Sequence, residues 1–263
     1  RSILSSYFFS KTGKFKFDYL DKIKQFPLTK DFMSLGIDVN NNVEVFKNFI
    51  NVQKFINQEN KNINFLKTHS SLCKIYNANF TDYQNSLGVI YIVRDPRNVV
   101  TSMVNHYGYN IDEATKIITN EKKFLDKSPN NCSVFVGSWG FNFNSWKEFQ
   151  KKNKYILVKY EDLIKRKKTV FIRIFKFFEQ LGIKLELDMS KLNMALKSTE
   201  FEKMKSLEKK EEFDEALIDD KTGKRRIFFN LGPKNDWRKL LDDKNKLIIE
   251  KNFKKEMLEL GYL

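Results

Sequence analysis

Three short apolar runs in the sequence have the pattern of buried β-strands. Residues 63–67, 87–93 and 155–160 are rich in Val, Ile, Leu, Phe and Tyr, and the second is apolar almost without interruption. Such a run is typical of a strand in a parallel sheet that helices cover on both faces. We therefore expect these three segments to be strands of one mostly parallel sheet.

Between the runs, apolar residues recur at the spacing of amphipathic helices. The clearest helix is predicted from Pro96 to about Tyr107, because Asp95 is a good N-cap and proline suits the first helical position. Further helices are predicted through Ile3, Leu4, Tyr7 and Phe8, in short pieces within 14–60, and over 112–125, 134–150, 170–181 (ending at Gly182), 192–207 and 244–260.

Strands that alternate with helices predict an α/β fold in three layers, with a central mostly parallel sheet flanked by helices. No internal repeat, low-complexity linker or domain boundary is visible, so residues 1–263 are expected to form a single domain. Residues 208–236 have the charged, glycine-containing composition of a loop. No capping residue precedes the first helix, and we therefore expect the sequence to be truncated at its N-terminus.

The charge of the chain narrows its partners only slightly. With 48 Lys+Arg against 33 Asp+Glu, the formal charge is +15, which favours nucleic acid, acidic lipid or a phosphate- or sulfate-bearing small molecule. AT-rich coding would produce the same lysine excess on a solvated surface. Two cysteines cannot form a disulfide framework, and neither a signal peptide nor a membrane-spanning run is visible. A cytoplasmic protein without a membrane span is therefore expected.

Polar residues stand where the predicted strands end, which is where open α/β sheets bind ligands. The first strand leads to Lys67 and His69, the second to Arg94 and the third to Tyr160. The near-neutral pKa of histidine suits proton abstraction, although an ordinary loop histidine has the same signature. Arg94 precedes a helix N-terminus, which favours an anion, but it is equally placed to pair with Asp95.

The helix after Arg94 carries two further polar residues. Ser102 lies about two turns into it and is placed to add a hydroxyl to an anion site, whereas His106 is interpreted as structural. The sequence lacks the G-x-x-x-x-G-K-[ST], G-x-G-x-x-G and G-x-S-x-G motifs and any Cys/His cluster with metal spacing. No metal is therefore expected.

Five segments, in this order, resemble the family of sulfotransferases that use 3′-phosphoadenosine 5′-phosphosulfate (PAPS), closest to the cytosolic type. The run from Val89 through Arg94 to Ser102 is the most specific match, because the apolar strand and the arginine-to-serine spacing both agree. The other four matching segments are 65–69, which resembles the Lys-Thr-His strand end, 158–163 (Tyr-Glu-Asp), 198–204 (Thr-Ser-Phe-x-x-Met) and 228–238 (Arg-Lys-Gly…Gly-Asp-Trp-Lys).

The resemblance implies a P-loop-NTPase-like fold and an in-line transfer of a sulfuryl group to a hydroxyl or amine. It implies that His69 is the general base, that Lys67 contacts the transferred group, and that Arg94 and Ser102 hold the 3′-phosphate of PAPS. The other cofactor-binding residues that it implies are Tyr160, Thr199, Phe201, Phe229 and Gly232.

Two departures from the family pattern qualify this expectation. The first strand and the phosphosulfate loop are missing from the sequence, so weak cofactor binding and poor transfer are expected. The late Arg-Lys pair is replaced by Asn230-Leu231, and Arg225 and Arg226 are the candidates to replace it.

The acceptor is expected to be a small molecule or a glycan. Aromatic residues within 11–60 and 105–150 suit a pocket for an apolar or aromatic alcohol, and suit core packing equally well. Three alternatives stay open: a nucleotide or nucleoside kinase with Asp95 and Asp162 for magnesium, a catalytically degenerate family member, and a nucleic-acid-binding protein. The last is disfavoured by the core-like spacing of the aromatics, so no nucleic-acid partner is expected. The oligomeric state is open.

Overall fold

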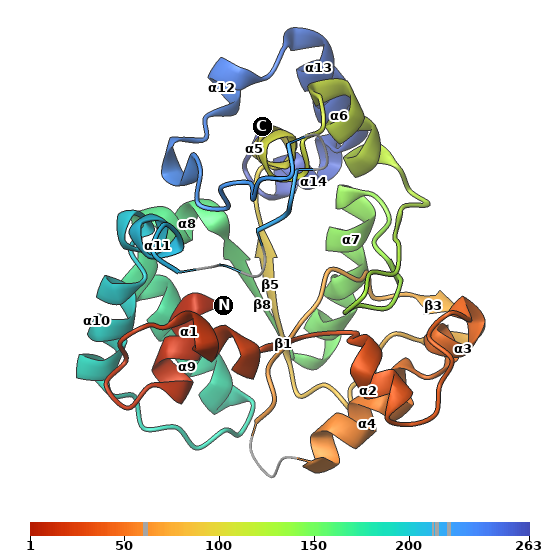
Figure 1. Ribbon diagram of the computed structural model, residues 1–263, viewed down its shortest axis with the longest axis vertical. Coiled ribbons are helices and arrows are strands. Elements are labelled where there is room, and N and C mark those ends of the chain that lie inside the picture. The colour runs from red at the N-terminus through yellow and green to blue at the C-terminus, as the bar shows by residue number, and fades with distance from the viewer. Residues whose placement is uncertain (60–62, 212, 214–215, 220–221) are drawn as a thin grey trace.

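The computed structural model describes residues 1–59, 63–211, 213, 216–219 and 222–263 (Figure 1). In chain order, with η for a 3₁₀ helix, the elements are α1 (Ser2–Phe9), η1 (Phe17–Lys22), β1 (Lys24–Gln25), α2 (Thr29–Met33), α3 (Asn42–Lys47), α4 (Phe49–Glu59), β2 (Leu66–Lys67), β3 (Lys74–Ile75), β4 (Ala78–Asn79), β5 (Val89–Val93), α5 (Pro96–Tyr107), α6 (Ile111–Thr119), β6 (Phe124–Leu125), β7 (Val134–Phe135), α7 (Trp139–Trp146), η2 (Lys147–Lys152), β8 (Tyr155–Lys159), α8 (Tyr160–Lys165), α9 (Lys167–Gln180), α10 (Met189–Ser198), α11 (Phe201–Glu208), η3 (Gly232–Lys234), α12 (Trp237–Leu240), α13 (Asp243–Asn252) and α14 (Lys254–Glu259).

The parallel pair β5–β8 lies at the centre of the molecule (Figure 1). Its register runs from Val89 opposite Tyr155 to Val93 opposite Lys159, so both strands end side by side. The strand that leads to His69 differs from the prediction in two ways. It is only two residues long, and β2 pairs in parallel with β1, in a sheet separate from β5–β8. The predicted α/β class with parallel strands flanked by helices is confirmed.

Alternate residues of β5 and β8 are covered from opposite sides, as the two-residue period of a strand requires. Ile90 and Val158 pack with α1, α9 and α10, whereas Tyr91 contacts Phe143 of α7. Ile92 differs from the prediction that the strand is buried on both faces, because 54% of its surface is exposed. The helical cover on that face therefore does not extend to the carboxyl end of β5.

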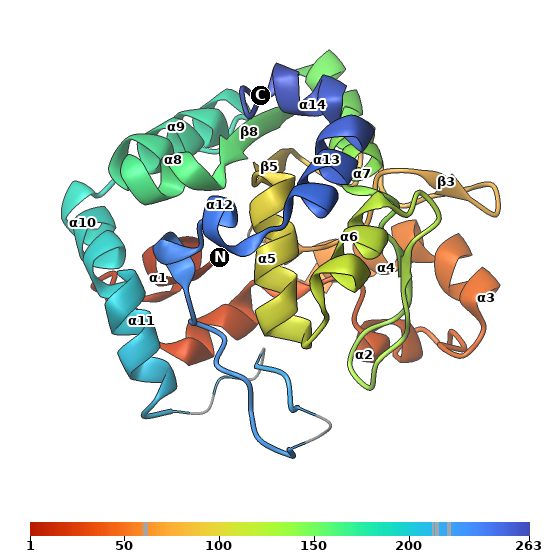
Figure 2. The ribbon, with the colours of Figure 1, turned by 90° about the horizontal axis from the view of Figure 1, so that it is seen from above.

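Helix α5 has the bounds predicted from its capping signals. The Asp95 side chain accepts a hydrogen bond from the Arg97 backbone N–H over 3.0 Å, and Pro96 occupies the first turn. Gly108 ends the helix with a φ of 75°, a left-handed conformation that glycine adopts without strain. In Figure 2, α5 stands beside α12 and α6, at the end of β5.

Three other helix predictions need correction. Within 134–150, the residues of β7 pair with β6, so the helix begins only at Trp139. The same pairing takes the end of the predicted helix 112–125 into β6. The closing helix 244–260 is interrupted at Phe253, whose φ of −116° and ψ of 21° are not helical.

The aromatic residues between positions 11 and 60 mainly form a core. Phe26, Phe32, Phe46 and Phe49 are each at most 3% exposed and pack together with Phe80 and Trp146. The sequence left open whether these rings line an acceptor pocket or pack in the core, and in the structure they pack in the core. In the part of the chain that the structure describes, no helix is long and apolar enough to cross a membrane.

Candidate active site

The ends of β5 and β8 bring Arg94 and Tyr160 together. The Arg94 guanidinium carbon lies 4.3 Å from the centroid of the Tyr160 ring, a cation–π contact. Asp95, the alternative partner for Arg94, is bound to Arg97 instead, with 2.8 Å between Arg97 Nη2 and Asp95 Oδ2. Arg94 therefore remains available at the strand end, held by an aromatic ring.

Arg94 has a buried donor that the protein does not satisfy. Its Nε has no hydrogen-bond partner among the described residues. Burial lowers the pKa of Arg94, and the nearby Tyr160, Glu161 and Asp95 offset that only in part. An unpaired buried donor costs about 1–3 kcal/mol. A bound anion would supply the missing acceptor, so this position fits the phosphate group that the sequence predicted here.

Lys67 and both histidines lie within electrostatic reach of one another. Burial lowers the pKa of Lys67 to about 8, and the positive charge of Arg1 acts in the same direction. His69 is partly open to water, but the surrounding protein reduces its hydration and lowers its pKa to about 4, helped by the charges of Lys67 and His106. His69 is therefore a neutral imidazole at physiological pH.

The backbone of the segment after His69 is fixed from α7 and the turn before it. Asn142 Nδ2 donates to the His69 carbonyl over 3.1 Å, and Trp146 Nε1 donates to the Ser70 carbonyl over 2.9 Å. The buried Ser71 hydroxyl donates to the carbonyl of Val136. These contacts hold the peptide that carries His69, while its imidazole keeps contact with water.

His106, which the sequence pattern indicated to be structural, lies within electrostatic reach of Lys67 and Arg226. It lies one turn after Ser102 on α5, and its pKa is lowered by burial and by the charges of Lys67 and Arg226. Its ring meets that of Phe228 edge-on, with the centroids 5.4 Å apart. A signal for it was available in the sequence, since Ser102 and His106 are four residues apart and share a helix face.

Arg226 lies against the end of α5, whereas Arg225 contacts the backbone at Phe213. A side-chain carbon added to Gly108 would lie 2.3 Å from Nη2 of Arg226, so the guanidinium packs directly on that glycine. Arg226 also forms an ion pair with Asp219. Arg225 is exposed and donates to the Phe213 carbonyl over 3.1 Å. Both arginines line a cavity of about 310 Å³ together with Lys205, Glu208, Lys209, Lys210, Glu211, Phe213, Ala216 and Ile227.

Residues 227–237 lie along α5. Asn98 accepts a hydrogen bond from the Trp237 backbone N–H over 3.0 Å, and the Thr101 hydroxyl donates to Asn235 over 2.7 Å. Farther along the helix, Asn105 donates to the Ile227 carbonyl over 3.3 Å. Figure 2 shows the result, with α12 beside α5. The late loop that the resemblance selected therefore reaches the helix that carries Ser102.

Phe201, Phe229 and Gly232 form one contact group. The rings of Phe201 and Phe229 meet edge-on with centroids 6.3 Å apart. Gly232 has a φ of +50°, and a side-chain carbon there would lie 2.1 Å from the Phe201 ring. Thr199, which the resemblance implies to be a cofactor contact, is buried, and its Oγ1 donates to the Ala195 carbonyl over 2.7 Å.

The described residues thus place the predicted site in two groups that α5 and the late loop connect. The first contains Lys67, His69 and Arg226, with His106 added, and the second pairs Arg94 with Tyr160. Phe228 contacts both His106 and Phe229. The ring centroids of Phe228 and Phe229 are 5.1 Å apart. Nowhere in the described ranges do three His, Cys, Asp or Glu side chains gather where they could hold a metal ion.

The fold and the site define an α/β protein with a half-buried arginine, stacked on a tyrosine, at the carboxyl ends of two parallel strands. The model of the sulfotransferase domain family matches residues 9–261, and the chain belongs to this family. This membership favours the sulfotransferase interpretation over the nucleotide-kinase alternative.

Relatives of known identity agree with the family assignment. Sulfotransferase 2A1 of Macaca fascicularis is 27% identical over 180 residues, which are 68% of this chain and 59% of that protein. The 3-beta-hydroxysteroid sulfotransferase of Cavia porcellus is 27% identical over 158 residues, 59% of this chain and 51% of that protein. The matched part thus spans between 51% and 59% of the length of these two relatives.

Solved structures show the same fold. Mouse sulfotransferase SULT7A1 complexed with PAP has a TM-score of 0.51 at 20% identity, covering 78% of this chain and 70% of that one. Retinol dehydratase in a complex with retinol and PAP has a TM-score of 0.53 at 20% identity, covering 74% of this chain and 53% of that one. The predicted P-loop-NTPase-like fold of the sulfotransferases is confirmed.

Proposed function

We propose that this protein transfers a sulfuryl group from PAPS to a hydroxyl or amine of a small molecule. The observation that carries the proposal is Arg94, which lies over Tyr160 with a buried Nε that lacks an acceptor. The family membership supports it, and two structural neighbours were solved in complexes with PAP. We also propose that residues 1–263 form a single domain.

In this proposal the second group of residues holds the nucleotide. Arg94 binds the 3′-phosphate with the hydroxyl of Ser102, since a guanidinium is the donor best matched to a phosphate. Tyr160, Phe201 and Phe229 supply aromatic surface beside the nucleotide. Of the remaining predicted cofactor contacts, Gly232 and Thr199 shape this surface through backbone and packing, and Arg226, unlike Arg225, points toward the site.

The first group of residues performs the proton transfer. Bound PAPS supplies an activated sulfuryl group and a good leaving group. His69 is neutral at pH 7 because its pKa is lowered to about 4, so its lone pair is free to take the proton of the acceptor hydroxyl. As the hydroxyl oxygen forms its bond to sulfur, the bridging S–O bond breaks and adenosine 3′,5′-bisphosphate leaves. Lys67 balances the negative charge on that bridging oxygen.

The relatives support a small apolar alcohol as the acceptor. One of them is a 3-beta-hydroxysteroid sulfotransferase, and two solved neighbouring structures contain retinol and androsterone. Next to Lys67 and His69, Phe228 and His106 provide a surface that is aromatic with one polar group. A cytoplasmic location, a metal-free reaction and the absence of nucleic-acid partners stay predictions.

Binding of adenosine 3′,5′-bisphosphate tests the nucleotide site. Calorimetry should show binding to the unmodified protein and a loss of about ten- to a hundredfold in Arg94→Ala, the equivalent of one charge-assisted hydrogen bond. Arg166→Ala is the matched control, because that guanidinium is 67% exposed and pairs with Asp162 on the surface. Equal affinity of all three proteins would refute the phosphate role of Arg94.

Transfer itself is tested with PAPS that carries labelled sulfur and with androsterone as acceptor. Labelled androsterone sulfate, absent when His69→Ala is used, is the expected result. Binding of the bisphosphate without any transfer to androsterone, retinol or a phenol would instead identify a degenerate family member that retains only the nucleotide site.

A further inference from the structure

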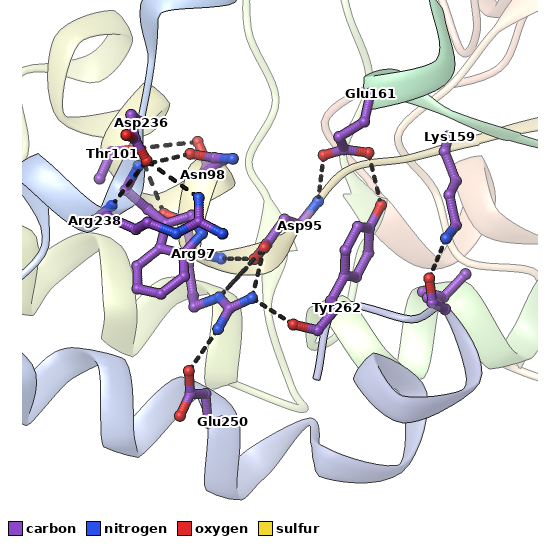
Figure 3. A network of polar contacts seen from close by, with 12 residues as sticks. Asp95, Arg97, Asn98, Thr101, Lys159, Glu161, Asp236, Arg238, Glu250 and Tyr262 are labelled. Atoms are coloured by element: carbon purple, nitrogen blue, oxygen red, sulfur yellow. Dashed lines mark hydrogen bonds and ion pairs between the residues drawn. The ribbon is translucent and has the colours of Figure 1, made fainter. Parts of the chain in front are cut away.

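Tyr262 is held by polar contacts at both its hydroxyl and its backbone carbonyl (Figure 3). Its hydroxyl donates to Glu161 Oε2 over 2.9 Å, and its carbonyl accepts from Arg97 Nη2 over 2.7 Å. Lys159 lies over its ring, with Nζ 5.1 Å from the centroid, and donates to the carbonyl of Leu260. The segment after α14 is therefore fixed against the ends of β5 and β8.

Glu161, which accepts from Tyr262, lies two residues after strand β8, and it bonds in turn to Asp95, two residues after strand β5. Glu161 comes immediately after Tyr160, and its Oε1 accepts a hydrogen bond from the Asp95 backbone N–H over 3.1 Å. Asp95 comes immediately after Arg94. This hydrogen bond joins the peptide next to Arg94 to the residue next to Tyr160, so it sets the separation of the two stacked side chains.

Arg97 supports the same arrangement through its contacts with Asp95 and the Tyr262 carbonyl. It is 4% exposed, and its guanidinium binds Asp95, Glu250 of α13 and the Tyr262 carbonyl, with 2.5 Å between Nη1 and Glu250 Oε1. Its Cζ also lies 3.9 Å from the centroid of the Trp237 ring. Arg97 thus anchors both Asp95 and the Tyr262 carbonyl, which lie on either side of the Glu161 carboxylate.

The hydroxyl of Tyr262 stays a donor over the whole physiological range. Burial raises its pKa, and the negative charge of Glu161 raises it further. A hydrogen bond from a hydroxyl to a carboxylate contributes more than one between neutral groups. Without the hydrogen bond from Tyr262, the Glu161 carboxylate would be free to rotate and to lose its bond with the Asp95 backbone N–H.

We propose that Tyr262 is a positioning residue of the nucleotide site, which acts through Glu161 to hold Arg94 over Tyr160. This inference rests on the proposed function, because it takes the 3′-phosphate as the ligand of Arg94. The Tyr262 hydroxyl reaches Arg94 through Glu161 and Asp95 and makes no hydrogen bond to it. Its contribution is selective: it supports the affinity for a 3′-phosphate and leaves the rest of the nucleotide site unchanged.

The test compares two nucleotides by calorimetry on the whole chain. Tyr262→Phe removes the hydroxyl alone, and it should weaken adenosine 3′,5′-bisphosphate about tenfold, a free energy of about 1.4 kcal/mol. Adenosine 5′-monophosphate, which lacks the 3′-phosphate, should bind within about twofold of its original affinity. Tyr155→Phe on β8 is the matched control, because the Tyr155 hydroxyl has no hydrogen-bond partner among the described residues.

A merely structural role of Tyr262 would weaken both nucleotides equally, or neither, and either outcome overturns the inference. Glu161→Gln, a second variant of unchanged size, should give the same selective loss, and it decides the matter if Tyr262→Phe unfolds. If the unmodified protein does not bind the bisphosphate, the proposed function falls and this inference falls with it. Binding that survives unchanged in both variants overturns the inference alone.

Discussion

Asn142 donates a hydrogen bond to the backbone carbonyl of His69 over 3.1 Å. Its other amide atom, Oδ1, accepts from the buried Tyr91 hydroxyl over 2.9 Å, so the amide orientation is fixed from strand β5. The bond fixes the peptide from which the His69 side chain projects, so Asn142 sets the position of the His69 backbone in the site.

We expect Asn142→Ala to lower sulfuryl transfer about tenfold while leaving the affinity for adenosine 3′,5′-bisphosphate unchanged, since a misplaced base slows only the proton transfer. Initial rates and calorimetry on the same protein separate the two effects. Asn144→Ala, two residues along α7, is the control: that side chain is exposed and bonds to Glu256 over 2.6 Å. A parallel drop in nucleotide affinity would contradict the prediction.

The two histidines offer a sharper comparison of roles. His69→Ala should lower turnover by about 10²- to 10⁴-fold, the usual contribution of a general base, with nucleotide binding nearly intact. His106→Phe keeps the aromatic contact with Phe228 and should change the KM for the acceptor more than the turnover number. Steady-state rates over a range of acceptor concentrations distinguish these outcomes, and a normal turnover number in His69→Ala would remove that residue from catalysis.

The protonation of the histidines should affect stability at mildly acidic pH. Desolvation lowers the pKa of His69 to about 4 and also lowers that of His106, so the unfolded chain binds more protons than the folded one below pH 6.5. Their contribution to stability is present above pH 6.5 and is lost as the pH falls toward 4.

Proton NMR measures this directly, because the chain has only two histidines. Both imidazole signals should titrate below pH 6.5, and the spectrum of His106→Phe assigns the remaining one to His69. A His69 signal that titrates at its ordinary pKa would show that the ring is fully hydrated.

Arg97 and Arg238 share the Trp237 ring but differ in burial, which makes them a matched pair. Arg97→Ala leaves Asp95 buried without its partner, so we expect a loss of about 3–5 kcal/mol in the free energy of unfolding. Arg238→Ala should cost less than about 1 kcal/mol, because that side chain is 70% exposed. Urea denaturation of the two variants measures both values, and similar losses would contradict the assignment of Arg97 to a buried network.

Gly232 is predicted to be intolerant of any side chain. Alanine there meets the Phe201 ring and a φ of +50°, and the displaced ring should weaken nucleotide binding. Gly223→Ala is the control, since Gly223 has a φ of +66° and open space around it. Combining Gly232→Ala with Phe201→Leu should recover part of the lost affinity, and calorimetry that shows no recovery would exclude the steric explanation.

The sequence predicts elements whose signals are local and fails where distant segments decide. Helix α5 was predicted with its bounds because Asp95, Pro96 and the helical spacing all lie within a few residues of each other. The strand character of Val134 was missed, because it depends on pairing with Leu125, and the apolar pattern alone equally suits a helix.

The same division applies to the site. Arg94 and Tyr160 were predictable because parallel strands end at one edge of a sheet, and the structure stacks them there. The proximity of His106 to Lys67 and Arg226 has no local signal, because the fold brings these residues together from distant parts of the sequence. The engagement of Arg97 with Glu250 and Tyr262 likewise has no local signature.

The Arg97–Tyr262 contact also orders events during synthesis. These residues are 165 positions apart, so a ribosome must synthesise the chain through Tyr262 before Arg97 meets its acceptor. Domains generally fold as they emerge, and a nascent chain here would pack β5, β8 and α9 well before it could fix Arg94. Nucleotide capture by a nascent chain would therefore report that translation had passed Tyr262.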